Sequence, residues 1–132
     1  MQTLLPKGWP RPRGYANGIV ADGRQVYVAG MVGWRPDGTW ETDDMTGQIE
    51  QALKNIIDVL AEAEAGPEHI VRMTWYVTDS QAYSTSLKKI GSVWRDIMGK
   101  NFPVMAVVEV VRLVEERAKV EIETTAVVPA KN

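Results

Sequence analysis

Cysteine is absent from this sequence of 132 residues, and histidine and phenylalanine occur once each. Without cysteine the chain has no disulfide, no thiolate nucleophile and no cysteine-ligated metal site. No run of about 18 consecutive apolar residues occurs, so no segment is predicted to span a membrane. Residues 1–7 also lack the charged lead and apolar stretch of a signal peptide, and we therefore expect a cytoplasmic protein.

Neither sign of charge is in excess. Fifteen Lys and Arg against 17 Asp and Glu give a formal net charge of −2. This balance offers no electrostatic reason to expect nucleic acid or an anionic membrane as a partner. The single histidine, His69, stands at a predicted strand start and is expected at the surface. No set of His, Asp and Glu has metal-ligand spacing, and no glycine-rich phosphate loop occurs, so we predict neither metal nor cofactor.

One domain is predicted over residues 1–132, because no linker or repeat divides a chain long enough to bury a core. Prolines and glycines mark residues 1–14 as an irregular lead-in. Alternating apolar residues predict strands at residues 15–21, 25–31, 39–42, 70–77, 102–114 and 118–128. Apolar residues at three- and four-residue steps predict helices at residues 46–65 and 79–98. The order β-β-β-α-β-α-β-β describes an α+β fold.

The two predicted helices can cover only one face of such a sheet. Residues 104–108, with 110 and 111, are nevertheless apolar on both faces, as expected for a strand buried on both sides. No third helix is available within the chain to cover the second face. We infer that another copy of the protein covers it and that the chain forms an oligomer.

Two segments near the end of the chain carry a recognisable pattern, FPVMAVVEVVRL at residues 102–113 and VEIETTAV at residues 120–127. They resemble the closing strands of the reactive intermediate deaminase (Rid, or YjgF) family, which read roughly F-P-A-R-S-x-V-x-V-x-x-L and v-E-I-E-x-x-A. Earlier segments agree in the same order, at residues 15–19, 27–30, 48 with 52–56, 71–74 and 77–79. The resemblance implies a chorismate-mutase-like subunit, a homotrimer packed sheet to sheet, and a small-molecule cleft at each subunit boundary.

Rid proteins are best known for hydrolysing reactive enamines and imines, such as 2-aminoacrylate, to a 2-keto acid and ammonia. The arginine of the F-P-A-R motif binds the substrate carboxylate, a task for which a bidentate guanidinium is suited. Met105 stands at that position here, so the chain resembles an arginine-lacking subgroup. The resemblance assigns Glu121 to the attacking water, since an electrophilic iminium needs only oriented water and an acid for the departing ammonia. Glu121 also fits an ordinary interface charge.

The resemblance implies further cleft residues around these two. The expected substrate-binding residues are Tyr15, Gly30, Met31, Trp34, Met105 and Val107. Gly30 lets backbone approach a ligand, although it also fits a plain turn. Strand parity places Glu121 and Glu123 on the face assigned to the interface, where Glu123 could pair across the trimer. Arg13 and Arg35 are weaker candidates to replace the missing arginine at the cleft mouth.

Two functions stay open at this point. The first is a cofactor-independent deaminase of a reactive enamine or imine, whose substrate is not a simple 2-amino acid enamine because Met105 replaces the arginine. Met31, Met105 and Val107 then favour a larger or more apolar substrate. The second is a non-catalytic, small-molecule-binding or regulatory trimer that uses the same cleft. RNA cleavage ranks last, because neither a basic patch nor a set of stacking aromatics is evident.

Overall fold

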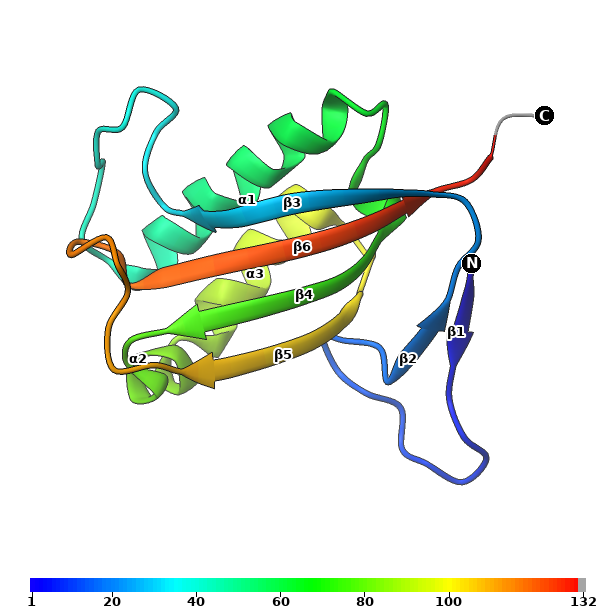
Figure 1. The fold of residues 1–132 in the computed structure, drawn as a ribbon. Helices are drawn as coiled ribbons and strands as arrows, with labels where there is room; N and C mark the ends of the chain where they lie inside the picture. Colours follow the sequence, from blue (N-terminus) through cyan, green and yellow to red (C-terminus); the bar gives the residue numbers. More distant parts are fainter. Residues whose placement is uncertain (131–132) are drawn as a thin grey trace.

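The computed structural model describes residues 1–130 and contains a four-stranded sheet with the order β3-β6-β4-β5 (Figure 1). The strands are β1 (Gln2–Leu4), β2 (Gly18–Val20), β3 (Arg24–Val32), β4 (Ile70–Val77), β5 (Val104–Glu109) and β6 (Val120–Val128). The helices are α1 (Met45–Ala61), the 3-10 turn η1 (Pro67–His69), α2 (Ser80–Thr85) and α3 (Leu87–Met98). The predicted α+β class is confirmed.

The sheet mixes two kinds of pairing. β6 runs antiparallel to both β3 and β4, whereas β4 and β5 are parallel. A parallel pair needs a crossover connection, and α2 with α3 supplies it. Asp79 caps the N-terminus of α2, where its carboxylate accepts hydrogen bonds from the backbone N–H groups of Gln81 and Ala82.

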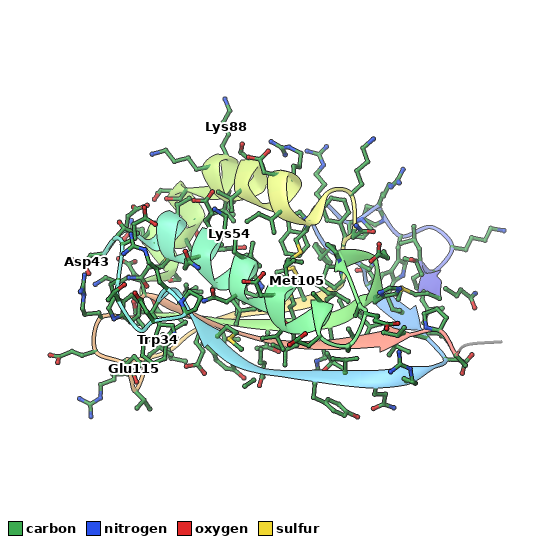
Figure 2. The ribbon with its side chains drawn as sticks, turned by 90° about the horizontal axis from the view of Figure 1, so that it is seen from above. Trp34, Asp43, Lys54, Lys88, Met105 and Glu115 are labelled. Atoms are coloured by element: carbon green, nitrogen blue, oxygen red, sulfur yellow. The ribbon has the colours of Figure 1, made fainter. Side chains whose placement is uncertain are left out.

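The helices all pack on one face of the sheet, as the face count predicted (Figure 2). The apolar stripe of α1 is completely buried and consists of Ile49, Ala52, Leu53, Ile56 and Leu60. α3 contributes Ile90, Trp94 and Met98 to the same core. From below, β4 and β6 present alternate residues, among them Met73, Trp75, Val120 and Ile122.

The second face of the sheet carries both polar and apolar side chains. β4 places Arg72, Thr74 and Tyr76 there, paired across the sheet with β6 residues that include Glu121 and Glu123. β5 adds the apolar side chains of Val104, Ala106 and Val108 on this face, and β3 adds the exposed ring of Tyr27. The pattern of residues 104–108, apolar on both faces, is thus found in β5, while β4 and β6 carry on this face the polar residues that strand parity placed there.

Four predicted segments differ in detail. Residues 1–14 are not wholly irregular, because β1 forms an antiparallel ladder with β2 outside the main sheet. No strand forms at residues 39–42, where Thr39 is instead held in a turn by the Asp37 carboxylate. The expected helix 79–98 is interrupted at Ser86, and the expected strand 102–114 ends with β5, leaving Val111 almost fully exposed.

A buried glutamine ties α1 to the loops at one end of the sheet. The Gln48 amide nitrogen donates to the carbonyls of Thr42 (3.2 Å) and Arg117 (3.0 Å), and its Oε1 accepts from the N–H of Lys119 (2.7 Å). The side chain is completely buried. Because each of these backbone groups would otherwise be left unpaired, Gln48 fixes the chain where it enters β6.

Candidate functional site

The residues expected in one cleft lie on opposite faces of the sheet. Met105 pairs with Met73 and therefore shares the helix-covered face. Glu121 pairs with Tyr76 on the open face. The thickness of the sheet separates the two side chains, so within a single chain they do not meet.

A pocket of about 490 Å³ lies on the helix side, between α3 and the parallel strands. It brings together three of the expected binding residues, Tyr15, Met105 and Val107. Figure 2 shows Met105 between the helices and the sheet. The lead-in reaches this pocket because the Ala16 N–H donates to the Pro103 carbonyl (2.9 Å), which aligns residues 13–15 beside the start of β5.

Aromatic rings form the pocket wall. Trp94 stacks on Phe102 with ring centroids 6.3 Å apart and planes 13° apart, and Trp75 lies 6.2 Å from Trp94 on its other side. Tyr83 meets Trp75 edge-on at 6.3 Å. Burial raises the pKa of Tyr83 above its ordinary value. The indole N–H of Trp75 is buried without an acceptor in residues 1–130.

The rim of the pocket is apolar yet open. Leu87 is 54% exposed, Tyr15 44% and Phe102 40%, although each carries a large apolar surface. Such a cluster beside a pocket is typical of a surface that receives a ligand or another protein.

The charged residues of the pocket are both cationic. Arg13 and Arg95 line it, and no Asp or Glu is among the described residues that do so. Arg13 was considered from the sequence. Arg35 does not reach the pocket, because it lies in the 35–39 turn and pairs with Glu41 at 3.6 Å. Arg95 was missed; its place one turn after Gly91, at the edge of the apolar stripe formed by Ile90 and Trp94, was the available signal.

The open face holds the second group of residues. β3 bulges between Val28 and Met31, and Gly30 lies in this bulge beside Glu121. A Cβ atom on Gly30 would stand 2.5 Å from Glu121 Oε2, so the missing side chain makes room for the carboxylate. Glu121 is half-buried and makes no hydrogen bond or ion pair with another residue in 1–130.

The neighbouring carboxylate, Glu123, is engaged within the chain. It accepts a hydrogen bond from the Tyr76 hydroxyl at 2.6 Å, and this bond raises the pKa of Tyr76. Of the two open-face glutamates, Glu121 is therefore the one free to hold a water molecule.

Met31 and Trp34 lie apart from both groups. Met31 pairs with Ile122 and packs against the core on the helix side. Trp34 lies beyond the end of β3, near Asp43 and Glu115 in Figure 2, with its ring 5.8 Å from that of Trp40. Neither residue lines the aromatic pocket.

Within residues 1–130, no three or more His, Asp or Glu side chains are grouped so that they could hold a metal ion. No helix in the same part of the chain is long and apolar enough to cross a membrane.

The family model described as endoribonuclease L-PSP, which covers the YjgF and Rid proteins, matches residues 10–128. The chain belongs to this family. A human Rid-family relative named 2-iminobutanoate/2-iminopropanoate deaminase is 25% identical over 114 residues, 86% of this chain and 79% of that protein. Imine deaminases are thus among the members of the family.

Solved structures of Rid-family proteins share the fold. The conserved protein YyfB from Yersinia pestis, described as of unknown function, superposes with a TM-score of 0.85 at 26% identity, covering 96% of this chain and 98% of that chain. Rv2704 from Mycobacterium tuberculosis, of the YjgF/YER057c/UK114 family, has a TM-score of 0.66 at 34% identity, with 88% of each chain covered. The predicted YjgF-type, chorismate-mutase-like fold is confirmed.

Proposed function

We propose that this protein is a cofactor-independent deaminase that hydrolyses a reactive imine or enamine at a site shared by two subunits of a homotrimer. The observation that carries the proposal is the placement of Glu121. Its carboxylate has no partner in the described chain, stands over Gly30, and lies on the sheet face that no helix covers. The names of imine-deaminating relatives support the reaction class.

The chemistry asks little of the protein. Glu121 accepts a proton from a water molecule as that water attacks the imine carbon, forming a tetrahedral carbinolamine. Glu121 passes the proton it accepted to the nitrogen, which leaves as ammonia as the C–N bond breaks. The hydroxyl then gives its own proton to Glu121, and the carbon becomes a carbonyl. An enamine enters the same path once its carbon is protonated to give the iminium. A carboxylate that orients water in this way contributes typically 10²–10⁴-fold to the rate.

The shared site follows from the faces of the sheet. Glu121 and Gly30 occupy one face, whereas Tyr15, Met105 and Val107 line the pocket behind the other. Both groups can act on one substrate only if the open face of one copy packs beside the pocket of another. The exposed apolar rim of the pocket favours such packing.

The substrate differs from a simple 2-amino acid enamine. Met105 offers no hydrogen-bond donor where the carboxylate-binding arginine of the family resemblance would stand. A volume of about 490 Å³ with an aromatic wall favours a larger and more apolar compound than a three-carbon acid.

The first test is ammonia release from imine and enamine substrates generated in situ. We expect the Glu121→Ala variant to lose about 100-fold or more in rate relative to wild type. Equal rates for the two proteins would remove Glu121 from the mechanism.

Mixed oligomers test the shared site. Glu121→Ala lacks the water-binding half, and Met105→Trp fills the pocket half. When the two variants are unfolded and refolded together, about one quarter of the sites combine two intact halves in a cyclic trimer, so activity returns. Each variant refolded alone is the control. If the mixture stays as inactive as the separate variants, the site does not span subunits.

The second candidate is a non-catalytic trimer that binds a small regulatory ligand in the same cleft, and Met105 favours it by removing the usual anion clamp. The Met105→Arg variant separates the two functions. Hydrolysis of 2-aminoacrylate by this variant supports an enzyme whose water-handling half is intact. Ammonia release at the buffer rate from wild type and variant, with every imine tried, supports the binding protein.

A further inference from the structure

We infer that Arg95 binds the carboxylate of a flat, conjugated ligand, so that the anion-binding side chain of the pocket lies on α3 instead of on β5. The inference rests on the proposed function for the identity of the site, because it concerns the same pocket. It adds a specificity-determining residue and a chemical class of ligand.

The local geometry of α3 turns Arg95 toward the pocket. Arg95 lies on the side of α3 that lines the pocket, together with Leu87, Ile90, Gly91 and Trp94. The Nη1 atom of Arg95 lies 3.5 Å from the position that a Cβ atom on Gly91 would take. The guanidinium thus folds back along the helix by one turn and lies beside Gly91, at a distance that an ordinary van der Waals contact would have.

The cationic side chains of the pocket have no partner. Arg13 and Arg95 form no hydrogen bond or ion pair through their side chains with another residue in 1–130, and the Trp75 indole N–H is buried without an acceptor. No carboxylate in the described lining neutralises them. Two guanidinium groups without a neutralising carboxylate favour a ligand that brings negative charge, because arginine binds a carboxylate through charge-assisted hydrogen bonds.

The ligand class follows from the remaining lining. A guanidinium binds a planar carboxylate through two parallel hydrogen bonds, and no Ser or Thr hydroxyl of the kind common in phosphate sites lines the pocket. The nearly parallel rings of Trp94 and Phe102 provide a flat apolar wall for an extended π-system. The pocket is therefore suited to an aromatic or unsaturated carboxylic acid.

The test is calorimetric titration of the intact protein with trans-cinnamate and with its neutral isostere cinnamamide. Wild type should prefer cinnamate. Arg95→Ala should weaken cinnamate binding by about tenfold or more while leaving cinnamamide unchanged. Arg95→Lys should fall between them, because a lysine keeps the charge but not the bidentate fork. The matched control is Lys88→Ala, an exposed cation on the same helix that points away from the body of the molecule in Figure 2.

Equal binding of the two probes to wild type, or full cinnamate affinity in Arg95→Ala, overturns the inference. Ammonia assays on the same proteins keep this result separate from the proposed function. Arg95-dependent cinnamate binding without imine hydrolysis supports the inference and defeats the deaminase. If imine hydrolysis requires Glu121 but not Arg95, and wild type does not prefer cinnamate, the deaminase is supported and the inference about Arg95 is overturned.

Discussion

Two glycines at the end of β3 allow the same substitution to be made with opposite consequences. At Gly30, an added Cβ meets Glu121 at Oε2 (2.5 Å), Cδ (2.9 Å) and Cγ (3.1 Å), all within one flexible side chain. At Gly33 it meets the backbone oxygen (2.5 Å) and Cα (2.6 Å) of Gln48, inside the buried face of α1. Neither glycine has a positive φ angle, so alanine is allowed by the backbone at both positions.

The magnitudes follow from which atoms must move. In Gly30→Ala the Glu121 carboxylate shifts by about 1 Å to regain ordinary contact distance. We expect the free energy of unfolding to stay within about 0.5 kcal/mol of wild type. In Gly33→Ala helix α1 itself must move, which costs about 1–3 kcal/mol, as other overpacked sites do. At about 4 °C per kcal/mol for a domain of this size, Tm falls by roughly 4–12 °C.

Thermal melts followed by circular dichroism measure the change in stability of each variant, and ammonia release measures the change in catalytic rate. Gly30→Ala should keep its Tm but lose about 100-fold in rate, because a catalytic group displaced by 1 Å no longer aligns with its target. In a Glu121→Ala background the same change should have no further effect. A Tm for Gly30→Ala as low as that of Gly33→Ala would refute the reasoning about flexible and rigid neighbours. An unchanged rate would refute the role given to the position of Glu121.

Two further predictions concern buried polar groups and tyrosines. Gln48→Ala should lower the free energy of unfolding in urea by about 2–4 kcal/mol, since it strands three backbone groups, whereas Gln51→Ala on the same helix should cost far less. Stability supported by the raised pKa values of Tyr76 and Tyr83 is present below the ordinary tyrosine value of about 10 and is lost as pH rises above it. Tyrosinate absorbance should show Tyr76 titrating at lower pH in Glu123→Ala than in wild type, and an unchanged midpoint would contradict the hydrogen bond as cause.

Local pattern predicted those parts of the fold in which side chains alternate against a single core. The strands and helix stripes that include Met73, Trp75, Ile122 and Ile56 were predicted correctly because burial on one face imposes a period of two or 3.6. β1 was missed because its residues are exposed and its pairing with β2 is set by chain geometry rather than by burial. Residues 39–42 resemble a strand only until the Asp37 side chain captures Thr39 in a turn.

Sequence reasoning identified several candidate residues but did not place them relative to one another. The alternation of side chains along each strand was predicted correctly. Alternation alone, however, does not tell which residues of β5 and which residues of β6 lie on the same face of the sheet. That relation depends on the registers of both strands with β4, which put Met105 opposite Met73 and Glu121 opposite Tyr76. Arg95 was missed for a related reason, since only the packing of α3 against β4 and β5 brings this residue into the pocket beside Met105.

The position of a cation within the pocket constrains which atom of a substrate can react. Met105 lies on the sheet, half-buried, whereas Arg95 is exposed and lines the pocket from the helix layer above it. A carboxylate held by Arg95 would therefore stand farther from the sheet than one held at position 105. The imine carbon must still reach the water on Glu121, so the two groups of the ligand would be separated by more than the single bond of a 2-imino acid. Loss of the arginine on β5 and a pocket walled by Trp94 and Phe102 then have one common explanation, a longer conjugated acid whose carboxylate and imine lie at opposite ends.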